Sequence, residues 1–204
     1  MPILENTPDR ILEHWPNSGR SVILDLEYTS WEGSMSRKWC EPWEWREIVQ
    51  VGALVVEARD FSVVHAFESF VKPVKNPALS AYFKNLTGIR QEDLDERGLP
   101  YSEMTRKLKT VFEMGEQVIY NGWDGQVLIE NCLMHQLELP FDTRQFFNFR
   151  PLLAKSLNRL PSELTSCGLP ALAGIKLDLQ AHCALKDCQS IAASLARWRS
   201  KGII

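Results

Sequence analysis

Asp25 and Glu27 lie two residues apart at the end of an apolar run, residues 22–24. Such a run favours a buried strand, in which residues two apart point to the same face, so both carboxylates would project side by side. Their mutual repulsion would be relieved by a divalent cation, and hard oxygen ligands suit Mg²⁺ or Mn²⁺. The alternative is a strand end at which both acids reach water.

Asp124 follows a second predicted strand, residues 117–120, and the turn signal Asn121-Gly122. The apolar spacing that follows is helical, so Asp124 would lie at a helix N-terminus just past a strand end. It is either a metal ligand or an N-cap residue, for which Asp is well suited. Trp123 beside it would belong to the core or stack on a base.

His182 and Asp187 flank the start of a predicted amphipathic helix. An acid in the first turn of a helix is held rigidly, as a metal ligand must be. A histidine in the preceding loop has an unperturbed pKa of about 6.5 and could take a proton from an attacking water. The alternative is an exposed loop histidine and an acid favoured by the helix dipole.

These five residues, in this order, resemble the signature of the DEDDh 3′→5′ exonucleases, which include proofreading domains, RNase T and oligoribonuclease. A histidine five residues before the last aspartate marks the histidine branch. Further stretches resemble the histone-mRNA 3′-end exonucleases and their bacterial relatives; they are Glu-Ile-Val-Gln-Val-Gly-Ala at 47–53, residues 70–80 and 86–89, and the pair Trp123-Asp124. The resemblance runs from about residue 22 to residue 196.

The resemblance implies an α/β protein with the RNase H-like three-layer fold, a mixed five-stranded sheet flanked by helices. It also implies a catalytic set in which two Mg²⁺ (or Mn²⁺) ions lie about 4 Å apart. Asp25, Glu27, Asp124 and Asp187 would be the metal ligands and His182 the general base. The implied reaction is hydrolysis at the 3′ end of single-stranded RNA or DNA, with release of nucleoside 5′-monophosphates.

Substrate contacts are also expected from the resemblance. Glu27, Tyr28 and His182 would lie near the terminal nucleotide, with Trp123 beside them. Leu86, Gly88 and Ile89 would pack around the terminal base or ribose. The alternative for residues 86–89 is an ordinary turn after a helix, with Gly88 as the C-cap residue.

Residues 29–46, here called the tryptophan-rich segment, hold four of the seven tryptophans between the first two predicted strands. Hairpin loops normally have two to five residues, and much longer loops are often functional. The segment is either a flap that stacks a tryptophan on a base or an extension that covers a sheet edge or a partner surface.

The expected elements alternate in the way an α/β sheet with an antiparallel edge requires. Strands are predicted at 22–28, 48–58, 63–71 and 117–120, with a weaker one before Phe149. Helices are predicted near 80–85, 101–113, 125–137, 150–157 and 184–200, with a short one at 170–176.

The 204 residues, 45% of them apolar, predict a single domain at 21–204, which the resemblance implies is an exonuclease domain, after an N-terminal arm at 1–20 that lacks a signal-peptide core. No apolar stretch approaches the roughly 18–20 residues of a membrane span. Five cysteines without zinc spacing suggest reduced thiols and a cytoplasmic location. A net charge of −3 argues against broad binding of duplexes, and the basic clusters at 72–90 and 144–159 are expected to be solvated faces.

Two alternative functions stay open beside a 3′→5′ exonuclease. One is an oligoribonuclease-type enzyme for very short fragments; the other is a non-catalytic nucleic-acid-binding protein on the same fold, although none of the acids is missing. The expected partner is nucleic acid with a free 3′ end. The sequence leaves open whether the protein is a monomer or a homodimer.

Overall fold

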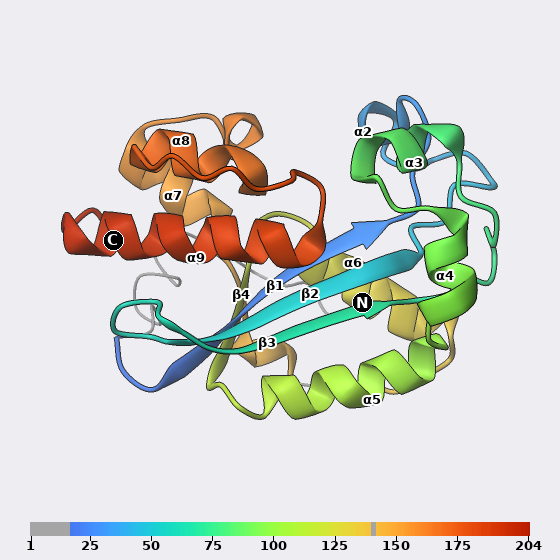
Figure 1. Ribbon diagram of the computed structural model, residues 1–204, viewed down its shortest axis with the longest axis horizontal. Helices are drawn as coiled ribbons and strands as arrows, with labels where there is room; N and C mark the ends of the chain where they lie inside the picture. Colours follow the sequence, from blue (N-terminus) through green and yellow to red (C-terminus); the bar gives the residue numbers. More distant parts are fainter. Residues whose placement is uncertain (1–16, 140–141) are drawn as a thin grey trace.

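The computed structural model describes residues 17–139 and 142–204, which form one sheet between two layers of helices (Figure 1). The strand order is β3-β2-β1-β4-β5. β1 pairs antiparallel with β2 and parallel with β4, so the sheet is mixed, as expected. The strands are β1 Arg20–Tyr28, β2 Ile48–Glu57, β3 Val63–Phe70, β4 Gln117–Tyr120 and β5 Phe146–Asn148.

The helices confirm each predicted one to within a few residues and add two short ones, α2 and α4. They are α2 Ser34–Arg37, α3 Ala81–Thr87, α4 Gln91–Arg97, α5 Tyr101–Phe112, α6 Asp124–Met134, α7 Arg150–Leu157, α8 Leu169–Ala173 and α9 Ala184–Ser200. Short 3₁₀ turns lie at Thr143–Gln145, Pro161–Glu163 and Ser166–Gly168.

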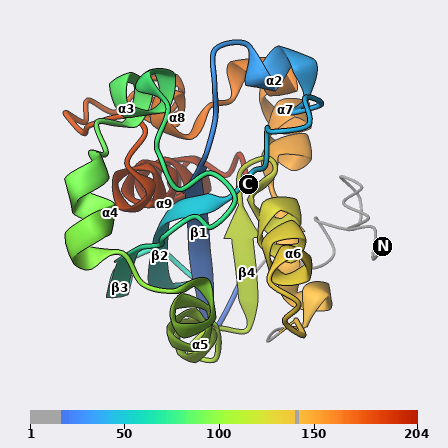
Figure 2. The same ribbon diagram turned by 90° about the vertical axis from the view of Figure 1, so that its right-hand side faces the viewer.

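Alternation along β1 sends successive side chains into two separate cores. Leu24 and Leu26 pack with residues of α5 and α6 on one face, whereas Ile23 packs with residues of α7, α8 and α9 on the other. Figure 2 shows α5 and α6 on one side of the strands and α9 on the opposite side. The three-layer fold follows from this two-sided burial.

The first turn of α9 lies unusually close to β2. A Cβ atom on Gly52 would come within 2.3 Å of the carbonyl carbon of Ala184, so only glycine permits this approach. The side-chain oxygen of Gln50 accepts a hydrogen bond from the Ala184 N–H at 3.0 Å, and the Cys188 thiol donates to the Gly52 carbonyl at 3.3 Å. These contacts fix the start of α9 over the sheet.

A third, smaller core joins β2 to α3 and α4. It consists of Val49, Leu79, Phe83, Ile89 and Leu94. The chain leading to α3 is tied to the sheet by the buried carboxylate of Glu47, which accepts backbone N–H bonds from residues 74–76 at 2.6–3.0 Å.

The predicted N-terminal arm, residues 1–20, lies almost entirely outside the described residues, and Arg20 is already the first residue of β1. Within residues 17–139 and 142–204, we find no helix with the length and apolar character that crossing a membrane requires.

Candidate active site

The candidate site lies where β1 ends. Because Leu24 and Leu26 are buried against α5 and α6, Asp25 and Glu27 turn to the opposite face, as the sequence pattern predicted. Both carboxylates are almost fully buried there, facing α9.

Asp124 reaches the same place through the pairing of two parallel strands. β4 ends opposite Leu24, so the chain that follows it passes beside the last residues of β1. Asp124 is the first residue of α6, and Trp123 occupies the N-cap position without a side-chain cap bond. The carboxylate therefore does not cap its helix; it is buried and accepts a hydrogen bond from the Leu26 backbone.

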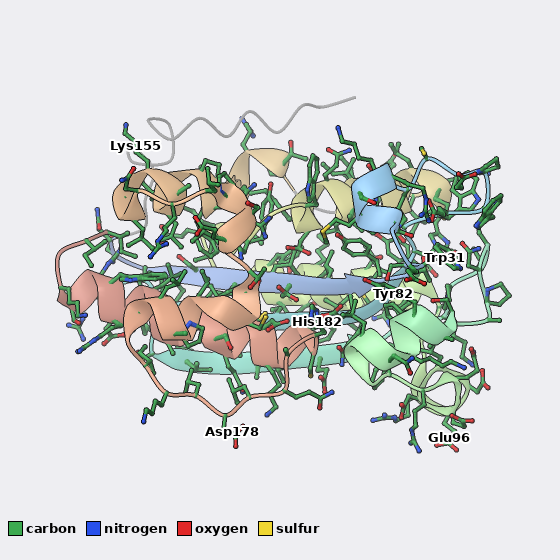
Figure 3. All side chains as sticks on the ribbon, turned by 90° about the horizontal axis from the view of Figure 1, so that it is seen from above. Trp31, Tyr82, Glu96, Lys155, Asp178 and His182 are labelled. Carbon is green, nitrogen blue, oxygen red and sulfur yellow. The ribbon has the colours of Figure 1, made fainter. Side chains whose placement is uncertain are left out.

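Asp187 and His182 approach from α9. Asp187 lies in the first turn of the helix, and His182 precedes it with a left-handed φ of 57°. This conformation is uncommon outside glycine and often marks functional positions. One ligand atom each from Glu27, His182 and Asp187 lie within 4.8 Å of one another. Figure 3 shows His182 close to the start of α9 and to the sheet.

All five residues line one cavity of about 290 Å³, here called the acidic cavity. The walls around these five residues are largely apolar and come from elements far apart in the sequence. They are formed by Trp31, Met35, Trp39, Tyr82, Leu86 and Trp123. Trp31 and Tyr82 lie near each other toward one end of β1 in Figure 3. An acidic floor below aromatic walls suits a ligand with a charged end and a flat apolar end.

Burial and mutual repulsion shift the titration of these groups. Desolvation, then the charges of neighbouring acids, raises the pKa of Asp25 and Glu27 well above the usual range. Desolvation also raises the pKa of Asp124 to about 7 and that of Asp187 to about 6. Burial lowers the pKa of His182. The repulsion among these buried carboxylates calls for a compensating positive charge.

The donor set fits divalent metal ions. Asp187 Oδ1 is buried and has no hydrogen-bond partner among the described residues, so one ligand atom is free. The site offers four carboxylates, the hard oxygen donors that suit Mg²⁺ and Mn²⁺, and places one imidazole beside them. Asp25, Glu27, Asp124 and Asp187 would hold the ions.

Sequence reasoning missed a group of polar residues behind Asp25. Ser166 donates a hydrogen bond to Asp25 Oδ1 at 3.1 Å and accepts one from Asn121 Nδ2 at 3.2 Å. Arg150 in turn donates to Asn121 Oδ1 at 2.8 Å. Arg150 was assigned to a solvated basic face; instead it is half-buried and lines the acidic cavity, where its charge opposes the rise in the pKa of Asp124.

The predicted substrate-contact residues divide into two groups. Tyr28, Leu86 and Trp123 line the acidic cavity beside Glu27 and His182, and Trp123 is 62% exposed, so it is not a core residue. Gly88 and Ile89 do not line it. Gly88 is the left-handed C-cap of α3, the alternative considered for this turn, and Ile89 is only 5% exposed in the third core.

The tryptophan-rich segment is folded by its own hydrogen bonds. Trp39 Nε1 donates to the Thr29 carbonyl at 3.0 Å, and the buried carboxylate of Glu44 accepts from Ser34 and pairs with Arg37. Trp31 and Trp39 line the acidic cavity, as a flap requires, whereas Trp43 and Trp45 do not. The two halves of the segment thus face different surroundings.

Known proteins with similar sequences are exonucleases by name. ERI1 exoribonuclease 2 of Danio rerio is 25% identical over 203 residues, 89% of this chain and 35% of that protein. The probable 3′-5′ exonuclease KapD of Bacillus subtilis is 32% identical over 122 residues, 59% of this chain and 56% of that protein. The chain thus spans between about a third and somewhat over half the length of these two relatives.

The fold is shared with solved nuclease structures. The nuclease domain of 3′hExo, a DEDDh family member, bound to rAMP, matches with a TM-score of 0.78 at 22% identity, over 91% of this chain and 94% of that one. A full-length 3′-exonuclease matches with a TM-score of 0.79 at 21% identity, over 91% of this chain and 83% of that one. The sequence profile of the RNase T exonuclease family matches residues 22–195, a span that holds every residue of the acidic floor, and the chain belongs to this family.

Proposed function

We propose that this protein is a metal-dependent 3′→5′ exonuclease. It hydrolyses the terminal phosphodiester bond at the 3′ end of single-stranded RNA or DNA and releases nucleoside 5′-monophosphates. The observation that carries the proposal is the convergence of four buried carboxylates and one histidine in a single cavity of an exonuclease-family chain. The name of KapD, a probable 3′-5′ exonuclease, supports the 3′→5′ direction.

The chain's own groups would divide the work. Asp25, Glu27, Asp124 and Asp187 would hold two Mg²⁺ or Mn²⁺ ions, which when bound acidify a water and offset the charge that develops on the phosphate oxygens. Burial lowers the pKa of His182, which favours the neutral imidazole that would accept the proton of the attacking water. The aromatic walls would stack on the terminal base and exclude bulk water.

The size of the acidic cavity favours cleavage at a strand end. At about 290 Å³ it lies near the lower limit of known small-ligand pockets, which suits one terminal nucleotide. A duplex has no comparable small end group to insert. Single strands and short 3′ overhangs are therefore the expected substrates.

A time course on matched 5′-labelled single-stranded RNA and DNA tests the proposal, with Mg²⁺, Mn²⁺ or chelator and with Asp25→Ala as control. We expect a metal-dependent ladder that shortens from the 3′ end and an inactive variant. Absence of cleavage by folded, metal-supplied protein would overturn the proposal in favour of a non-catalytic binding protein. A strong preference for dinucleotides would indicate an oligoribonuclease-type enzyme instead.

A further inference from the structure

A second cavity, of about 430 Å³, lies beside the acidic cavity, between the tryptophan-rich segment and α6. We call it the upstream cavity. It is lined by Lys38, Trp39, Glu44, Trp45, Arg46, Glu130, Leu133 and Met134. Trp39 also lines the acidic cavity, so the two cavities share one wall. In Figure 2 the chain following α2 passes above one end of α6.

Large apolar side chains of the upstream cavity are open to solvent. Trp45 is 45% exposed and Leu133, on the outer face of α6, is 54% exposed. Adjacent exposed apolar side chains, rather than single scattered ones, are typical of binding surfaces.

Cations lie against the aromatic rings of this surface. The Arg46 guanidinium is 5.5 Å from the centre of the Trp39 ring and 6.0 Å from that of Trp123, so it bridges the rims of both cavities. The Lys75 ammonium is 5.5 Å from the Trp45 ring. Alternating ring faces and positive charges are the features that bind single-stranded nucleic acid, through base stacking and phosphate contacts.

The two acids of the upstream cavity do not reverse this charge pattern. Glu44 is buried and paired with Arg37, and Glu130 pairs with Arg46. Lys38 is exposed and makes no ion pair among the described residues. Lys38 and Lys75 are thus available to phosphates.

Building on the exonuclease function proposed above, we propose that the upstream cavity binds the nucleotides on the 5′ side of the terminal one. The single strand leaves the acidic cavity across Trp39, Arg46 and Trp123, and one of its bases stacks on Trp45. The occupant is the substrate strand itself, because the upstream cavity shares its Trp39 wall with the cavity proposed to hold the 3′ end and the nearby cations complement phosphate.

Binding and cleavage of a dinucleotide and an octanucleotide test this path. Fluorescence anisotropy with 5′-labelled oligonucleotides measures affinity in chelator, and kcat/KM is measured with Mg²⁺. Trp45→Ala should weaken octanucleotide binding by roughly 5- to 150-fold, the range expected for one stacked base, and lower the octanucleotide-to-dinucleotide ratio of kcat/KM. Trp43→Ala is the matched control, because Trp43 is 56% exposed in the same segment but lines neither cavity.

Leu133→Glu provides a second variant on an exposed helix face. Its new negative charge should repel phosphate and so weaken binding of the octanucleotide more than that of the dinucleotide. Melting temperatures of all variants confirm folding. Equal octanucleotide affinity for Trp45→Ala, Leu133→Glu and wild type overturns the inference and leaves the surface to a protein partner. If wild type binds the octanucleotide in a Trp45-dependent way but cleaves nothing, the upstream cavity is supported and only the exonuclease function fails.

Discussion

The Ser166 hydroxyl links Asp25 to side chains that end at a half-buried arginine. Through Asn121, Arg150 orients Ser166, and Ser166 holds one oxygen of Asp25, a carboxylate that would help to hold the metal ions. Groups behind metal ligands set the direction in which ligand oxygens point, and their loss typically costs about 10- to 100-fold in metal affinity or activity.

We expect Ser166→Ala to reduce exonuclease activity, or to raise the Mg²⁺ concentration needed for half-maximal activity, by roughly 10- to 100-fold. Ser162→Ala is the control, since Ser162 lines the same cavity from an exposed position. Activity measured across a Mg²⁺ titration separates the two variants. Identical curves for both would show that the hydrogen bond to Asp25 has no role in holding metal.

The spacing of residues predicted the charged floor of the site but not what supports it. Asp25 and Glu27 share a face because of strand periodicity, which is local. Ser166 lies 141 residues from Asp25, and only the tertiary fold brings the two together. No short motif marks such a pair, so Ser166, Asn121 and Arg150 could not be assigned from the sequence.

At the scale of elements, the close packing of α9 on β2 places Asp187. We expect Gly52→Ala to destabilise the protein by about 1–3 kcal/mol, because the added methyl would overlap the backbone at the start of α9. Activity should fall further than the loss of folded protein explains, since α9 must move and carry Asp187 with it. Urea denaturation and turnover per folded molecule measure the two effects. Wild-type values for both would contradict the packing account.

Glu47 holds the segment between β3 and α3. Its buried carboxylate accepts three backbone N–H groups, so we expect Glu47→Ala to lower the free energy of unfolding by about 2–4 kcal/mol through unsatisfied donors. Glu57→Ala is a suitable control because Glu57 forms only a half-exposed ion pair with Arg20. Equal destabilisation in the two variants would argue against this role.

Most elements were predictable because their apolar residues repeat with a clear period, as in α7 and α9. α4 was not, because its sequence has a single apolar residue, Leu94, among charged ones. Its start is held instead by the Asp93 carboxylate, which accepts the Arg90 backbone N–H at 2.9 Å. α2 is a four-residue helix within a long connection, too short to show a period.

At the scale of the whole molecule, the acidic cavity joins β1, α6 and α9, so its charge affects the stability of the entire fold. Burial raises the pKa of Asp124 from 3.8 to about 7 and that of Asp187 to about 6. Between the unfolded and folded pKa values the folded chain binds more protons than the unfolded chain. The stability that this linkage contributes is fully present below about pH 4 and is lost as pH rises through about 6 to 7.

We therefore expect metal-free wild type to lose stability relative to Asp124→Asn between pH 5 and pH 7.5, measured by urea denaturation in chelator. Added Mg²⁺ should reverse the difference, because an ion that binds only the folded state stabilises it. A pH-independent difference between the two proteins would contradict the raised pKa of Asp124. Comparing the two proteins at each pH controls for the other titrating groups, because both proteins carry them.

The order of the site residues along the chain also has a consequence during protein synthesis. Asp25 and Glu27 are made early, but the site is completed only by His182, just before α9, and by Asp187 in the first turn of that helix. During synthesis, a nascent chain that has not yet reached residue 182 therefore carries three of the four acids of the cavity but lacks both His182 and Asp187. On the proposed function, we expect a nascent chain to leave RNA intact, the message that encodes it included, until α9 has left the ribosome and packed against β2 at Gly52.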